Sequence, residues 1–240
     1  MRGWTRVVLN LQSAMQTSVA SARPHRFKIV TYNILANKFA VGGMHAYCPD
    51  KYLEWGYRSK LIKEELLQYD GDIVCLQEVE DSVFRSELKP FFSALGFEGL
   101  FQPRQLPKPV KSPLAGPLDG AAMFYRTSMF RPFKVKGAAR AVGGLGFHFA
   151  KCELPPAIKA SQGKEGLGVF WDSFFKRQEG GVMSLLEHRP SSSPVLAVCT
   201  HLFWNPRYPD VKAMQAAVLC HKVCIRLRIH LLWMPLSYLR

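Results

Sequence analysis

Acidic residues are scarce in this chain of 240 residues, and no two cysteines have the CxxC spacing. Asp and Glu number 18 against 32 Lys and Arg, which leaves a formal net charge of +14. This surplus favours polyanionic partners such as nucleic acid, phosphoinositides or a charged membrane surface, without selecting one of them. The six cysteines lack CxxC spacing, and Cys75 and Cys199 lie in apolar runs where a reduced thiol acts as a small hydrophobe. A reducing compartment therefore fits the cysteine pattern best.

Long apolar runs are missing as well, since no stretch reaches the roughly 18 uncharged apolar residues of a membrane span. The nearest approach, residues 223–235, is interrupted by two Arg and one His. We therefore expect a soluble chain with no membrane partner. The first acidic residue is Asp50, and residues 1–26 carry four Arg among several Ser and Ala. That composition suits either an organellar transit peptide or a disordered basic tail. If the segment is not a transit peptide, we expect a cytoplasmic or nuclear location.

The chain is long enough for one large domain, and 48% hydrophobic residues are ample for the core of such a domain. We expect a basic tail over residues 1–25, the domain over residues 26–224 and a distinct tail over residues 225–240. Residues 102–118 contain five prolines and form a basic loop. In the second tail, Arg alternates with Ile and Leu, which favours an edge strand or an exposed segment.

Apolar patterning predicts alternating strands and helices along this domain. Residues 155–180 are interpreted as an insertion that an aromatic cluster anchors on the core. The predicted strands are 26–36, 71–80, 119–126 and 146–154, with a hairpin across 181–206, and the predicted helices are 55–69, 82–97 (interrupted at Pro90) and 210–223.

Three of the predicted strands end on a polar side chain. Asn33 follows KIVTY, Glu78 follows DIVCLQ, and His201 follows VLAVCT. Each residue alone is more often a solvated surface residue, but strands that line up in sheets bring their ends to common edges. The three side chains are therefore expected to share one cleft. A carboxylate beside an amide and an imidazole suits a hard divalent cation and a phosphate, because Mg²⁺ prefers one or two carboxylates plus substrate oxygens and water.

Four ordered motifs resemble the endonuclease/exonuclease/phosphatase superfamily, most closely its carbon-catabolite-repressor-type deadenylases with their nocturnin and 2′-phosphodiesterase relatives. The motifs are VTYNILA (30–36), DIVCLQEVE (72–80), DGAAMFYR (119–126) and CTHLFWNPRYPDVKAMQ (199–215). The resemblance implies a four-layered α/β sandwich of two mixed β-sheets flanked by helices. It also implies Mg²⁺-dependent hydrolysis of a phosphodiester, typically removal of 3′-terminal adenosines from messenger RNA, so the implied partner is RNA with poly(A) 3′ ends.

The resemblance also assigns roles to the polar strand ends. Glu78 matches the carboxylate that binds Mg²⁺, and Asn33 matches an amide that helps to orient the metal and the attacking water. His201 matches a histidine that hydrogen-bonds the scissile phosphate and stabilises charge in the transition state. All three are therefore candidate catalytic residues, with Glu78 as the metal ligand.

Further positions of the motifs are assigned to the substrate or to structure. Asn205 and Pro206 resemble residues that border the substrate groove. Asp119 is a candidate for substrate binding, although a structural role in the turn before its strand is the favoured interpretation. The resemblance implies that Trp55, Arg58 and Gln215 pack around the site and support the residues that form it.

The sequence departs from the family pattern in its last part. A GDFN-like strand end, implied to bind phosphate and activate water, and an SDH motif, implied to supply a general base, occur nowhere in the sequence. We therefore expect a C-terminally truncated domain with an incomplete second half and weak or no activity. A phosphatase or phosphodiesterase acting on 2′-5′ oligoadenylate, NADPH or a phospholipid, a non-catalytic RNA-binding remnant, and an unstable fragment remain alternatives. Protein partners are unknown.

Overall fold

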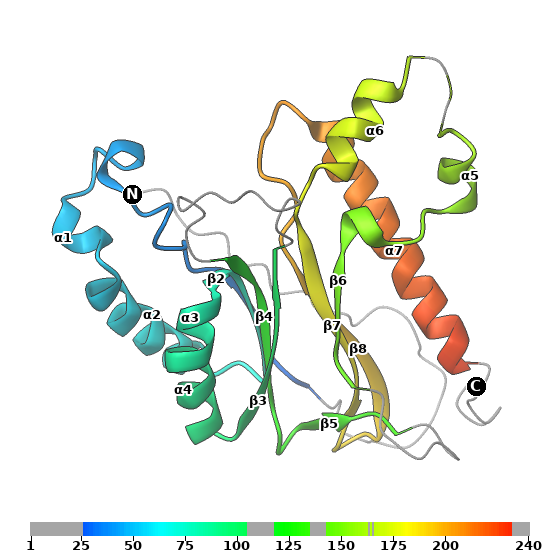
Figure 1. Ribbon diagram of the computed structural model, residues 1–240. Helices are drawn as coiled ribbons and strands as arrows, with labels where there is room; N and C mark the ends of the chain where they lie inside the picture. Colours follow the sequence, from blue (N-terminus) through cyan, green and yellow to red (C-terminus); the bar gives the residue numbers. More distant parts are fainter. Residues whose placement is uncertain (1–25, 105–117, 135–142, 163, 165, 232–240) are drawn as a thin grey trace.

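The computed structural model describes residues 26–104, 118–134, 143–162, 164 and 166–231. These residues form two stacked sheets with helices on both outer faces (Figure 1). The expected tail over 1–25, most of the basic loop over 102–118, and residues 232–240 lie outside the described residues.

The first sheet has the strand order β1-β2-β4-β3. Strands β1 (Ile29–Asn33) and β2 (Ile73–Glu80) run parallel, and β4 (Asp119–Arg126) pairs antiparallel with both β2 and β3 (Phe97–Pro103). This sheet is therefore mixed. Gly120 allows β3 and β4 to approach, since a Cβ there would stand 2.1 Å from the Gln102 carbonyl oxygen.

The second sheet is built around β7 (Gly180–His188), and all of its described strand pairs are antiparallel. Strands β5 (Phe130–Pro132), β6 (Leu145–His148) and β8 (Ser193–Thr200) each pair with β7. The hairpin predicted across 181–206 is confirmed by β7 and β8, and β8 ends immediately before His201.

Helices cover the outer face of the first sheet (Figure 1). They are α1 (Asp50–Leu53), α2 (Trp55–Tyr69), α3 (Asp81–Val83), a π-helical turn (Phe84–Leu88) and α4 (Lys89–Ala94), with a 3₁₀ turn at Gly42–Met44. The helix predicted over 55–69 is confirmed. Residues 81–94 are helical without a break, and Pro90 follows directly after the π turn, where the regular α-helical hydrogen bonding is interrupted.

A second helical layer covers the other sheet. It consists of a 3₁₀ turn (Phe149–Lys151), α5 (Pro156–Lys159), α6 (Gly168–Phe175) and α7 (Pro209–Leu231). The aromatic cluster of the predicted insertion does anchor it, because Trp171 and Phe174 of α6 are buried against this sheet. Across the described helices, none combines the length and apolar character needed to cross a membrane.

Alternation along the strands divides the core into layers, because successive side chains of a strand point to opposite faces. In β2, Val74 and Leu76 pack beneath the first helical layer, whereas Ile73 and Cys75 pack between the two sheets. A third cluster lies between the second sheet and α6 and α7. The predicted α/β fold of two sheets flanked by helices is therefore confirmed.

Three predictions differ from the structure. The strand expected over 146–154 ends at His148 and gives way to a 3₁₀ turn, and strands β3 and β5 were not predicted. The edge-strand alternative for residues 225–240 is wrong for 225–231, because α7 runs unbroken to Leu231. The helix continues an established hydrogen-bonded ladder, which costs less than nucleating a new element.

Phe124 lies at the centre of the core beneath the first helical layer, and we expect Phe124→Ala to lower the free energy of unfolding by about 3–5 kcal/mol. Its ring is fully buried and stacks on Phe92 with centroids 4.0 Å apart, so truncation leaves a cavity. Urea denaturation followed by circular dichroism measures the change. Tyr47→Ala, at a side chain 86% exposed, is the matched control and should leave the midpoint unchanged. Equal midpoints for both variants would contradict this packing.

Candidate active site

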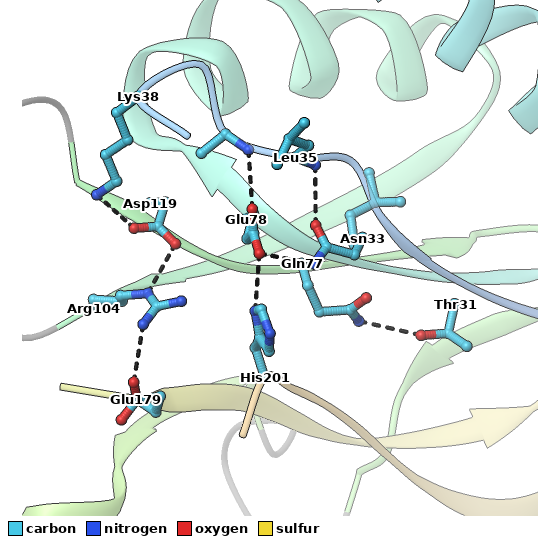
Figure 2. Close-up of polar contacts among 12 residues, drawn as sticks. Thr31, Asn33, Leu35, Lys38, Gln77, Glu78, Arg104, Asp119, Glu179 and His201 are labelled. Carbon is cyan, nitrogen blue, oxygen red and sulfur yellow. Dashed lines mark hydrogen bonds and ion pairs between the residues drawn. The ribbon is translucent and has the colours of Figure 1, made fainter. Parts of the chain in front are cut away.

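Glu78 occupies a bulge in β2, where the ladder with β4 is interrupted. The register shifts between Gln77 and Val79, and Glu78 has a φ of 59°, in the left-handed region that side chains other than glycine rarely adopt. Such backbone strain persists only where the surrounding structure holds it in place. The bulge directs the carboxylate toward the loop after β1 and toward His201 (Figure 2).

Two neutral donors from the end of β1 hold this carboxylate. The Asn33 side-chain amide donates to Glu78 Oε1 at 2.8 Å, and the Ala36 backbone N–H donates to Oε2 at 3.2 Å. The Asn33 oxygen accepts in turn from the Leu35 backbone N–H at 3.0 Å, which fixes the orientation of the amide. The predicted proximity of Asn33 and Glu78 is confirmed.

Arg58 of α2 holds the loop that carries these donors. Its guanidinium donates to the carbonyl oxygens of Ile34 and Leu35 at 3.0 and 2.8 Å, and to the side chain of Asn37 at 2.7 Å. Leu35 has a φ of 58°, so the loop is strained and benefits from an external clamp. The implied supporting role of Arg58 matches this geometry.

His201 faces Glu78 from the end of β8. Its Nδ1 atom lies 3.9 Å from Glu78 Oε1, too far for a hydrogen bond, and has no hydrogen-bond partner among the described residues. Burial lowers the pKa of His201, and the positive charge of Arg104 lowers it further, against the opposing effect of Glu78. The imidazole is therefore neutral at pH 7 and carries one N–H.

A chain of two buried carboxylates and two partly exposed cations lies beside this group and joins the two sheets. Asp119, which is fully buried, pairs with Lys38 at 2.6 Å and with Arg104 Nε at 2.8 Å. Arg104 Nη1 also pairs with Glu179 at 3.0 Å (Figure 2). Two cations thus balance two carboxylates, so the network is electrically neutral. Because both oxygens of Asp119 are engaged by cations, its visible role is to hold Lys38 and Arg104.

Gln215 of α7 extends this network to the loop after His201. Its side-chain amide donates to Glu179 Oε2 at 3.3 Å, and its oxygen accepts from the Phe203 backbone N–H at 2.8 Å. The Gln215 side chain is fully buried, so neither hydrogen bond is exchanged with water. The position of His201 therefore depends on α7 as well as on β8.

A small pocket opens along this network. The residues that line it are Gln102, Arg104, Asp119, Gly120, Ala121, Glu179, Gly180 and His201. Of the predicted site residues, only Asp119 and His201 line this pocket, whereas Asn33, Glu78, Asn205 and Pro206 do not. The Asn205 oxygen accepts from the Arg207 backbone N–H at 3.0 Å and shapes the local turn. Sequence reasoning missed Lys38 and Glu179, since neither lies in a recognisable motif.

The site fits a divalent cation held by one carboxylate. Within the described residues, no three His, Cys, Asp or Glu side chains gather as a metal cage. Glu78 has a side chain only 12% exposed, and its one ion-pair partner in the described part of the chain is His201, which is neutral. Asp119 and Glu179, by contrast, already pair with cations. An uncompensated carboxylate of this kind suits Mg²⁺, which completes its shell with water and phosphate oxygens.

The fold and these motifs agree with a family assignment. The model of the Endonuclease/Exonuclease/phosphatase family matches residues 30–215, and the chain belongs to this family. It is 29% identical over 210 residues to the CCR4-Not complex 3′-5′-exoribonuclease subunit Ccr4 of Saccharomyces cerevisiae, covering 88% of this chain and 23% of that protein. It is 30% identical to the same subunit of Yarrowia lipolytica, covering 82% of this chain and 26% of that protein. The chain thus spans about a quarter of the length of these curated relatives.

Solved structures show the same architecture. The crystal structure of ANGEL2, a 2′,3′-cyclic phosphatase, superposes with a TM-score of 0.59 at 25% identity, covering 80% of this chain and 45% of that chain. The human Nocturnin catalytic domain with bound sulfate superposes with a TM-score of 0.57 at 22% identity, covering 82% and 57%, and supports the fold alone.

Arg104 lowers the pKa of His201, so we expect Arg104→Gln to raise it. The substitution removes a positive charge and leaves Asp119 and Glu179 less compensated, and both changes favour the imidazolium form. The pKa is measured by NMR titration of the His201 ring protons in metal-free buffer. Arg131→Gln, at an exposed ion pair with Glu187, is the matched control and should not move it. An unchanged His201 pKa in Arg104→Gln would contradict the proposed electrostatics.

Proposed function

We propose that this chain provides the metal-binding and phosphate-binding part of a Mg²⁺-dependent phosphodiesterase that acts on RNA 3′ ends, poly(A) in messenger RNA turnover above all. The observation that carries the proposal is the carboxylate of Glu78, nearly buried, held by neutral donors and facing the His201 imidazole at 3.9 Å. The Ccr4 relatives are 3′-5′ exoribonuclease subunits, which supports RNA as the substrate class.

In this proposal Glu78 holds the Mg²⁺ ion. When bound, the ion polarises a phosphoryl oxygen and lowers the pKa of water. Asn33 and the Ala36 N–H keep the carboxylate in one orientation, so the ligand is in place before the substrate arrives. His201 donates its single N–H to a phosphate oxygen and stabilises charge that develops in the transition state.

We propose weak or absent turnover for this chain. Activation of water needs a proton acceptor, and the carboxylates of Asp119 and Glu179 are both held in ion pairs beside the site. His201, which lines the pocket, is assigned to the phosphate. The GDFN and SDH motifs, which the family resemblance assigns to this step, do not occur in the sequence. The alternative to a slow enzyme is therefore a chain that binds RNA without cleaving it.

Trp204 offers a surface for a nucleobase beside the site. Its side chain is 69% exposed in the loop that follows His201. The loop is anchored through the neighbouring Phe203, which is buried, hydrogen-bonded to Gln215, and covered by the Arg177 guanidinium at 3.9 Å from its ring centroid. An exposed indole on a fixed loop suits stacking on an unpaired base.

Replacement of Glu78 tests the metal site. We expect Glu78→Gln to weaken binding of Mn²⁺, a probe for Mg²⁺, by at least about tenfold, or ~1.4 kcal/mol, because the neutral amide cannot replace the carboxylate charge. Isothermal titration calorimetry measures the affinity. Glu64→Gln, on the exposed face of α2, is the matched control and should bind as the parent chain does. Equal affinities for all three proteins would refute Glu78 as the ligand.

A substrate panel tests the activity. The substrates are poly(A), RNA ending in a 2′,3′-cyclic phosphate, 2′-5′ oligoadenylate, NADPH and inositol phosphates, each with Mg²⁺ and with EDTA. We expect slow release of 5′-AMP from poly(A), lost with EDTA and in Glu78→Gln. Salt-sensitive RNA binding without any Mg²⁺-dependent product would support the binding-only rival. Faster turnover of a different substrate would overturn the assignment to poly(A).

Replacement of Trp204 tests the base-stacking surface. Loss of one stacked base costs about 1–3 kcal/mol, so Trp204→Ala should weaken oligo(A) binding about 5- to 150-fold. Trp204→Phe should retain most of the affinity because it keeps an aromatic face. Fluorescence anisotropy with labelled oligo(A) measures binding, and Tyr69→Ala, at an exposed tyrosine of α2, is the control. Affinity that is the same in Trp204→Ala and Tyr69→Ala would count against the surface.

A further inference from the structure

Strand β6 presents alternating small residues to β3 of the other sheet. Gly144 stands immediately before β6, and Gly146 and His148 follow at alternate positions, so the three residues share one face. A Cβ on Gly144 would lie 2.4 Å from the Leu100 side chain, and a Cβ on Gly146 would lie 1.6 Å from Gln102 Oε1. Because both positions lack a side chain, Gln102 reaches across from β3 and meets His148.

Two acceptors fix the side-chain amide of Gln102. Its nitrogen Nε2 donates to the Pro103 carbonyl oxygen at 3.1 Å and lies 2.9 Å from His148 Nε2. A carbonyl oxygen can only accept, which places nitrogen rather than oxygen at this end of the amide. One amide hydrogen therefore points to Pro103 and the other to His148, whose Nε2 accepts it only when that nitrogen carries no proton.

The surroundings of His148 favour the neutral imidazole that this hydrogen bond needs. Burial lowers the pKa of His148, and the positive charge of Lys151 lowers it further, against the opposing effect of the Gln178 backbone. The titratable and charged groups beside this pair lie on the 3₁₀ turn after β6, on α7 and in the pocket. They are Lys151, Cys152, Lys222, Arg104, Glu179 and His201.

The side-chain oxygen of Gln102 keeps its capacity to accept a hydrogen bond. Both amide hydrogens are engaged, whereas no donor from the residues that the structure describes reaches Oε1. The oxygen occupies the space that a side chain at the exposed Gly146 would fill, and Gln102 lines the pocket together with His201. An acceptor of fixed orientation therefore stands in the same pocket as the imidazole that is assigned to the phosphate.

We infer that Gln102 Oε1 accepts a hydrogen bond from a ribose 2′-hydroxyl of the RNA, and that His148 is the residue that positions it. The inference rests on the proposed function and adds how the site selects RNA over DNA. Oε1 has only lone pairs to offer, so its ligand is a donor, whereas phosphate oxygens at neutral pH are acceptors. The sugar is bonded directly to the phosphate, and its 2′-hydroxyl is the donor that DNA lacks. The base is assigned to Trp204, outside the pocket.

Binding of oligo(A) and oligo(dA) tests the role of Gln102. Fluorescence anisotropy with Ca²⁺ in place of Mg²⁺ compares the two labelled strands while turnover is suppressed. The parent chain should prefer RNA, and Gln102→Met should lower the RNA-to-DNA affinity ratio about 2- to 12-fold, the contribution of one hydrogen bond. Gln68→Met, at an exposed glutamine of α2, is the matched control and should leave the ratio unchanged. Circular dichroism checks that each variant is folded.

The pH dependence of the same ratio tests the role of His148. Protonation of Nε2 removes the acceptor for the Gln102 amide, so the ratio of the parent chain should fall as the pH drops through the lowered pKa of His148. Titration of His201 changes the phosphate contact of both strands alike and cancels in the ratio. His148→Gln keeps an acceptor that does not titrate and should hold the ratio constant, whereas His148→Phe should give a low ratio at every pH.

The outcomes separate this inference from the proposed function. If the parent chain binds neither strand, both fail. The inference alone is overturned if the parent chain shows no preference for RNA, or if the preference persists unchanged in Gln102→Met. An equal loss of RNA and DNA binding in Gln102→Met also overturns it, because the partner of Oε1 is then a base amine. Detection by NMR of a proton on His148 Nε2 at neutral pH would contradict the hydrogen bond itself.

Discussion

The Arg104 guanidinium is the interaction on which the arrangement of the site depends, because it bonds a buried carboxylate from each sheet at once. Asp119 begins a strand of the first sheet and Glu179 immediately precedes a strand of the second. A buried carboxylate is tolerated only when a cation pairs with it. Because Asp119 and Glu179 share the Arg104 guanidinium, the distance between the two sheets at this end is limited by the length of one arginine side chain. Lys38 and Gln215 complete the network from the loop after β1 and from α7.

The electrostatic design divides the carboxylates of this region into two kinds. Asp119 and Glu179 are neutralised by fixed cations, whereas Glu78 is held by an amide and a backbone N–H. The carboxylate of Glu78 has no Lys or Arg partner among the described residues, and this difference is the basis of the metal site proposed there. Burial and the positive charge of Arg104 lower the pKa of His201, which favours a neutral imidazole beside the Glu78 carboxylate. Family membership and the exoribonuclease relatives agree with this chemistry.

The sequence predicted the strands and the site residues correctly where a local run of apolar residues forms a buried strand. The strands ending at Asn33, Glu78 and His201 are apolar runs with a polar end, and the structure brings these three side chains together as predicted. The bulge at Glu78, strands β3 and β5, and the pairing of Arg104 with Glu179 were not predicted. Each of these depends on partners distant along the chain, so no local periodicity encodes it.

The side chains of β2 alternate between two layers of the core, and this alternation also determines how the protein unfolds. Ile73 and Cys75 pack against the second sheet while Val74 and Leu76 pack under the helices, so this strand belongs to both halves at once. Opening either layer exposes the apolar surface of the other. Neither half can therefore unravel as a separate foldon, and slow amide exchange in β2 and β4 will report the global opening of the whole protein.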